Sequence, residues 1–141
     1  MKKYLTLESE FMKFLSFIVL LMLSSTSFAA GGGGNSNSPF IPLNPPIIVN
    51  IVDGGKVRHM QVIIEMKLVD PTNSAKVDLH KGPIRHELIL LLSSQDAATI
   101  SSALGKEQLR KDALAAVQKV MQELEGKPII EALYFTNFII Q

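Results

Sequence analysis

Residues 57–69 read VRHMQVIIEMKLV, and this stretch decides the fold of the chain. Its apolar and polar residues alternate, which is typical of a β-strand with one face buried. The buried face is expected to carry Met60, Val62, Ile64, Met66 and Leu68. The preceding stretch, IIVNIV at 47–52, is rich in β-branched residues, and Asp53-Gly54-Gly55 offers a tight reversal between the two. We therefore expect a β-hairpin.

Two helical segments are expected after this hairpin. Asp70-Pro71 ends the strand, and apolar residues then recur at helical spacing up to Leu92. We expect a break at Gly82-Pro83, with Pro83 opening a second helical stretch. A short connector at 96–100 leads to a longer helix that begins after Ser101-Ser102, because serine caps helix starts. This helix is expected to reach Glu125, with Gly126 as its left-handed C-cap.

The last segment, residues 129–140, is rich in β-branched and aromatic residues and predicts a third strand. Strict alternation would place Leu133, Phe135 and Ile139 on one face. The other face would carry Tyr134, Phe138 and Ile140. A strand that is apolar on both faces is usually interior to a sheet or covered by a partner. The order β-β-α-α-β predicts an α+β domain with a small antiparallel sheet and helices on one face.

The N-terminal part does not belong to this domain. No charged residue lies between Lys13 and Asp53, and residues 14–23 are almost wholly apolar. Ten residues of helix are too short to span a bilayer. We therefore interpret residues 1–30 as a cleaved signal peptide. An uncleaved N-terminal membrane anchor is the alternative, and translation could start at Met1 or Met12. Residues 31–46, rich in Gly, Ser, Asn and Pro, predict a flexible linker, which leaves 47–141 as the domain.

The composition argues against most kinds of chemistry. The chain has no cysteine, which excludes disulfides and thiolate metal sites, and its 14 Lys and Arg are balanced by 13 Asp and Glu. The signs are interspersed, so no basic face for nucleic acid is visible. The three histidines are spaced as surface residues and not as metal ligands. No nucleophile motif or carboxylate pair is present. We therefore expect no enzyme activity, no cofactor, no metal and no small-molecule substrate.

Two features stand out as candidate surfaces. The first is GKEQLR at 105–110, at the start of the long helix, which is either a solvated helix face or a binding site. The second is the apolar second face of the last strand. That face is either part of the core or a docking surface for a neighbouring copy, because exposed apolar patches tend to be interaction sites.

Three segments together resemble the FliL family of flagellar basal-body proteins. They are RHELILLLS at 85–93, GKEQLR at 105–110 and YFTNFIIQ at 134–141. The short apolar N-terminus is closest to the signal-peptide-bearing FliL-like type. The resemblance implies a stomatin/prohibitin-type domain on the periplasmic side of the bacterial inner membrane, assembled into homo-oligomeric rings around the motor stator.

The same resemblance implies a non-catalytic role in flagellar rotation, swimming and swarming motility and chemotaxis. The residues that it marks for contact with stator or basal-body proteins are Arg85, Lys106, Arg110, Tyr134, Phe135 and Phe138. A periplasmic binding or envelope module of the same fold, unconnected with the flagellum, is the alternative.

Overall fold

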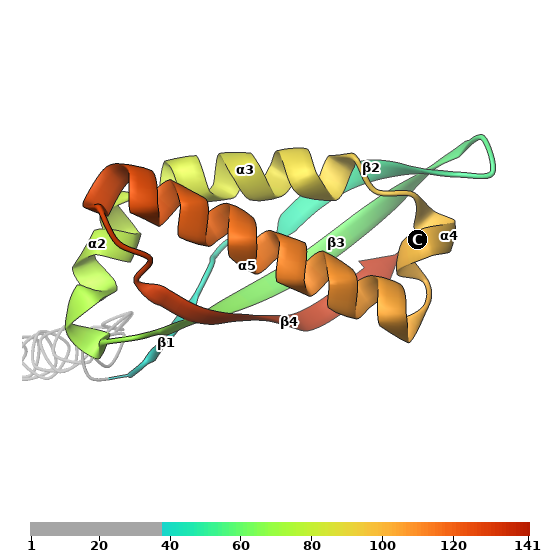
Figure 1. Ribbon diagram of the computed structural model, residues 1–141. Coiled ribbons are helices and arrows are strands. Elements are labelled where there is room, and N and C mark those ends of the chain that lie inside the picture. Colours follow the sequence, from blue (N-terminus) through green and yellow to red (C-terminus); the bar gives the residue numbers. More distant parts are fainter. Residues whose placement is uncertain (1–37) are drawn as a thin grey trace, which may run out of the picture. The chain divides into compact units, whose positions relative to one another are not determined.

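The computed structural model describes residues 38–141, which form a four-stranded antiparallel sheet with helices packed on one face (Figure 1). The strands are β1 (Phe40–Pro42), β2 (Ile47–Asp53), β3 (Lys56–Leu68) and β4 (Ile130–Ile140). The expected α+β class, with a small antiparallel sheet and helices, is confirmed. The signal peptide or anchor expected at 1–30, and the choice between Met1 and Met12, lie outside the described residues.

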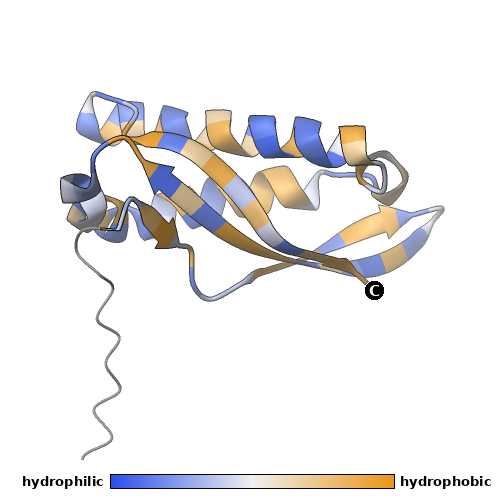
Figure 2. Cartoon of the chain, turned by 90° about the horizontal axis from the view of Figure 1, so that it is seen from below, coloured by the Kyte–Doolittle hydropathy of each residue, from blue (hydrophilic) through white to orange (hydrophobic). Residues whose placement is uncertain are grey.

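Strand β3 is the centre of the sheet, since each of the other three strands pairs with it. It is joined to β2 by a two-residue turn in which Gly54 and Gly55 have φ angles of 55° and 85°. These left-handed conformations suit glycine and match the twist of a hairpin. The five alternating residues from Met60 to Leu68 are all buried, as expected. Figure 2 shows the alternation as blue and orange bands along the strands.

Strand β1 was not expected, because the sequence predicted a linker up to Pro46. Phe40–Pro42 pairs with β3 at residues 65–67, next to the stretch at 56–62 that pairs with β2. Leu43 is buried, and its N–H donates to the Ile64 carbonyl at 2.9 Å. The linker prediction is therefore wrong for residues 40–46. Proline is compatible with a short edge strand, and here the prolines shape a corner between β1 and β2.

The helices are η1 (Pro71–Asn73), α2 (Ser74–Leu79), α3 (Lys81–Ser93), α4 (Ala97–Ile100) and α5 (Ala103–Glu125). Figure 1 shows α3 and α5 side by side over the sheet. The expected break lies at His80, earlier than Gly82-Pro83. As expected, Pro83 lies near the start of the second helical stretch, in the first turn of α3, where a backbone N–H has no partner within the helix. Gly126 has a φ of 73° and ends α5, as the sequence predicted.

Strand β4 differs from its expected form because two bulges interrupt its pairing with β3. The register shifts at Ile63/Ile64 and at Lys67/Leu68, which leaves Thr136 and Glu131 without a partner across the strand. Each extra residue reverses the phase of alternation. The side chains that face the helices are therefore Ile130, Leu133, Phe135, Phe138 and Ile140.

The expected grouping of Ile139 with Leu133 and Phe135, and of Phe138 and Ile140 with Tyr134, is wrong beyond the bulge at Thr136. Phe138 and Ile140 lie opposite the buried Val62 and Met60, on the same face as Leu133 and Phe135. Tyr134 and Ile139 point to the other face, where each is 41% exposed. Within residues 38–141, β4 pairs only with β3 and is an edge strand, not an interior one.

Candidate interaction surface

The start of α5 is fixed by a cap and by a close backbone contact. Ser102 caps the helix, because its hydroxyl accepts a hydrogen bond from the Gly105 N–H at 2.9 Å. A β-carbon added at Gly105 would lie 1.9 Å from the Thr99 carbonyl oxygen in α4. Only glycine therefore allows α4 and α5 to meet in this way. This gives a structural reason for the glycine of the GKEQLR segment.

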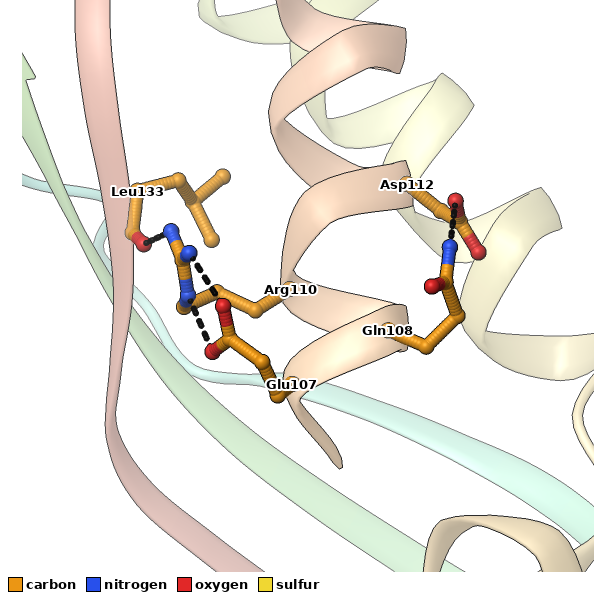
Figure 3. A network of polar contacts seen from close by, with 5 residues as sticks. All are labelled: Glu107, Gln108, Arg110, Asp112 and Leu133. Carbon is orange, nitrogen blue, oxygen red and sulfur yellow. Dashed lines mark hydrogen bonds and ion pairs between the residues drawn. The ribbon is translucent and has the colours of Figure 1, made fainter. Parts of the chain in front are cut away.

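From this fixed start, two basic side chains of α5, Lys106 and Arg110, reach β4. Figure 3 shows Arg110 between Glu107 and Leu133. Arg110 donates through Nη1 to the Leu133 carbonyl at 3.1 Å. Its Nε and Nη2 donate to the two carboxylate oxygens of Glu107 at 2.8 and 2.7 Å. These bonds lower the pKa of Glu107 and raise the pKa of Arg110. Arg110 is thus held in one orientation against the strand.

Lys106 lies one helical turn before Arg110 and approaches the aromatic side chains of β4. Its Nζ lies 5.3 Å from the centroid of the Phe138 ring, within cation–π range. The Phe138 and Phe135 rings are themselves 5.7 Å apart and tilted by 52°. We call Lys106, Arg110, Phe135 and Phe138 the α5–β4 seam. Four of the six residues marked from the sequence therefore come together.

Tyr134 does not join this seam, because it points to the face of the sheet away from the helices. There its ring lies 6.4 Å from that of Phe40. Phe40, Ile48, Val52, Val57, Tyr134 and Ile139 are the large apolar side chains exposed on this outer face of the sheet. Their exposure makes this face a second candidate contact surface, which the sequence did not indicate as a whole.

Arg85 is separate from both surfaces. It projects from α3 to the β1–β2 corner, where Nη1 donates to the Pro45 carbonyl at 2.5 Å and Nη2 to the Pro46 carbonyl at 3.4 Å. Neither carbonyl belongs to a strand. The guanidinium therefore satisfies backbone acceptors that the corner leaves open. Arg85 therefore stabilises the β1–β2 corner, a role that we call a brace.

Sequence reasoning missed a polar cluster at the far end of α5. The Glu125 carboxylate accepts from Lys76 Nζ at 2.6 Å and lies 2.7 Å from His80 Nε2. The bond from Lys76, followed by that from His80, lowers the pKa of Glu125. The cluster ties α2 to the end of α5. Partners separated by 45 and 49 residues leave no local signal in a sequence.

Residues 38–141 hold no group of three or more His, Cys, Asp or Glu side chains placed to bind a metal ion. Among their helices, none combines the length and apolar character needed to cross a bilayer.

Comparison with known proteins gives the context for this geometry. Residues 40–141 match the family model described as flagellar basal body-associated protein FliL. The chain belongs to the FliL family. The match begins at Phe40, the first residue of β1, and so includes the strand that the sequence prediction assigned to the linker.

Among curated proteins, this FliL-family chain is similar to "Flagellar protein FliL" of Aquifex aeolicus (strain VF5). The two are 28% identical over 99 residues, which is 70% of this chain and 59% of the relative. The chain thus matches less than two thirds of that protein's length. Two of the three segments that suggested the family, GKEQLR and YFTNFIIQ, meet in the α5–β4 seam, whereas Arg85 of the first segment lies at the β1–β2 corner.

Proposed function

We propose that this FliL-family protein is a non-catalytic part of the flagellar basal body that associates with the motor stator and supports rotation. The observation that carries the proposal is the family match over the whole of the described fold. The geometry is compatible with a binding role, because the seam and the outer face offer cationic and apolar contact groups. Swimming, swarming and chemotaxis would then depend on the protein through motor output.

The proposed place of action is the periplasmic side of the inner membrane. Support comes from the apolar run at 14–23 and the Ser27-Phe28-Ala29 pattern that suits a signal peptidase. A tagged full-length protein tests this by fractionation. A shortened, carbonate-soluble form in the periplasm would mean a cleaved signal peptide, and a full-length membrane-bound form would mean an anchor. Recovery in the cytosol at full length would contradict the proposed location.

We further propose that the protein forms a homo-oligomeric ring, with the outer face of the sheet as one contact. The six exposed apolar residues there, among them Ile48 at 64% exposure and Val57 at 68%, support this. Exposed apolar groups at this density favour association. Analytical ultracentrifugation of the protein, purified from the cell fraction in which the fractionation test finds it, tests the assembly. A monomer at every concentration would contradict it.

The motor role is tested by deleting the gene and restoring it in trans. The deletion strain should swim and swarm more slowly and recruit fewer fluorescently labelled stator units to each motor, while filaments still assemble. Restoration with the wild-type gene should recover both measures. Normal swimming, normal swarming and normal stator occupancy in the deletion strain would together refute the proposal.

A further inference from the structure

Among residues 38–141, half of the free edge of β4 has main-chain groups with no partner. His59 and Gln141 exchange two backbone hydrogen bonds, at 2.8 and 2.9 Å. In an antiparallel ladder such pairs alternate with pairs that exchange none. Ile140, which precedes Gln141, therefore turns its N–H and C=O groups away from β3. Phe138, two residues earlier, does so too. After the bulge at Thr136, Phe135 does the same.

The other half of this edge is already occupied by α5. Gln118 donates to the Ile130 carbonyl at 2.8 Å, and Arg110 donates to the Leu133 carbonyl. Both carbonyls face outward, which confirms the direction of the edge. Within residues 38–141, no hydrogen bond reaches the outward groups of β4 from Phe135 to Ile140. The open edge is thus about six residues long, the length of an ordinary strand.

The side chains that border the open edge are apolar and cationic. Phe135 and Phe138 are half-buried on the helix side, so each still offers part of its ring to a neighbour. Lys106 stands beside Phe138. The nearest carboxylate along α5, that of Glu107, is bound by Arg110 through two hydrogen bonds. No carboxylate of the described residues forms an ion pair with Lys106.

We infer that the open edge of β4 binds an extended peptide segment of a partner protein, which adds as a fifth strand and carries an acidic side chain next to Lys106. Main-chain hydrogen bonds to Phe135, Phe138 and Ile140 would supply the general affinity, as in other cases of strand addition. Apolar side chains on the helix side of the added strand would extend the contact with the two rings. The carboxylate would give the cation beside them a partner and set the register.

The charge favours a peptide of this kind over a second copy of the chain. Two copies that paired through the same six residues would bring their Lys106 side chains together, and like charges oppose association. The bound Arg110 and Gln118 would also stop the pairing from continuing along β4. The inference goes beyond the proposed function, since it names a surface and a kind of ligand whether or not the partner is a stator protein.

The test uses the full-length chain, labelled with ¹⁵N in a mild detergent, and two synthetic hexapeptides. The probe is acetyl-Thr-Val-Thr-Glu-Thr-Val-amide, and the control peptide has Lys in place of Glu. At millimolar probe, the amide protons of Phe135, Phe138 and Ile140 should exchange with water at least about fivefold more slowly. The control peptide should bind about tenfold more weakly, because its ammonium faces Lys106.

Two matched variants of α5 make the test specific. In Lys106→Glu the preference should reverse, so that the Lys peptide binds more tightly than the Glu peptide. Lys111→Glu makes the same change of charge at another exposed position of the helix and should leave the preference unchanged. Both positions are exposed, so both variants should fold, which the amide spectrum checks directly.

Three results would overturn the inference. One is a folded chain whose edge amides are unaffected by either peptide. Another is slowed exchange at these amides that grows with protein concentration and needs no peptide, which would mean pairing of two copies. The third is binding that perturbs the outer face at Tyr134 and Ile139 but not the edge. None of these depends on motility, so this inference and the proposed motor role fail separately.

Discussion

The regions of the sheet next to α3 and next to α5 each contact an arginine, but the two arginines bind different groups. Next to α3, Arg85 donates hydrogen bonds to two carbonyls of the β1–β2 corner. On the α5 side, Arg110 bonds one carbonyl of β4 and is held by Glu107. Arg85 thus binds both corner carbonyls. Arg110 binds only the Leu133 carbonyl of β4, and the outward main-chain groups of β4 from Phe135 to Ile140, beside Lys106, have no partner among residues 38–141. Two arginines of one chain thus differ in role: Arg85 binds the β1–β2 corner, whereas Arg110 lies next to the stretch of β4 that we propose as a binding edge.

The largest expected effect comes from disrupting the close contact between α4 and the start of α5 at Gly105. Gly105→Ala places a methyl group 1.9 Å from the Thr99 carbonyl oxygen, so the backbone of α4 or α5 must move. We expect a loss of about 3 kcal/mol in the free energy of unfolding, the upper end for overpacking. Urea denaturation followed by circular dichroism measures it.

Gly82→Ala is the matched control on the α3 side, because a β-carbon there meets nothing within 4 Å. It should be neutral or stabilise by up to about 1 kcal/mol, as alanine favours helix. Equal losses for the two glycines would show that the close contact between α4 and α5 is not the cause.

The arginines themselves come next. Arg85→Ala leaves two corner carbonyls without their donor, and we expect a loss of about 2 kcal/mol in the free energy of unfolding. Arg110→Ala should cost about 1 kcal/mol, because it removes one backbone bond and a pair with the half-exposed Glu107. Chemical denaturation of both variants under one condition gives the order. A larger loss of unfolding free energy for Arg110→Ala would contradict the stabilising role that we assign to Arg85 at the β1–β2 corner.

The Glu125 cluster predicts a dependence on pH. The pKa of Glu125 is lowered from an ordinary value of 4.5, chiefly by the bond from Lys76. A carboxyl group of this kind stabilises the fold above its unfolded pKa, and the effect is lost as pH falls through the folded pKa. Glu125→Gln should therefore lower Tm at pH 7, with the difference shrinking below about pH 4.5. A difference in Tm that stayed constant down to pH 3 would contradict this reading.

The smallest effect on stability is expected on the outer face. Tyr134→Ser removes an exposed ring and its contact with Phe40, which should cost about 0.5 kcal/mol. If this face is a contact between copies, the same change should weaken self-association far more than folding. Sedimentation velocity and urea denaturation of one preparation compare the two. A large loss of folding stability with unchanged association would remove Tyr134 from the proposed contact.

Local patterns in the sequence predicted the parts of the fold that local physics determines. The alternation from Met60 to Leu68, the turn at Gly54-Gly55 and the C-cap at Gly126 each depend on neighbours in the chain, and each is confirmed. β1 escaped prediction because three residues are too few to show a period. The face of Phe138 was assigned wrongly because a single bulge at Thr136 shifts the alternation, and nothing in the composition announces a bulge.

The candidate surface was predictable only in part. The sequence marked Lys106, Arg110, Phe135 and Phe138, but it could not show that they meet. Arg110 and Leu133, for example, are 23 residues apart in the sequence and come together only in the folded chain. Arg85 was marked on the same grounds and lies elsewhere. What separates the two arginines is which backbone carbonyls lack a partner, and that depends on the complete tertiary structure.

The central position of β3 has a consequence for the order of folding. Its hairpin with β2 closes over two residues, whereas β4 returns to it from about sixty residues further along the chain, and such distant pairings close slowly. We therefore expect β4 to dock late. A chain caught before that step has no β4 edge to offer, so the surface beside Lys106 exists only on molecules that have finished folding.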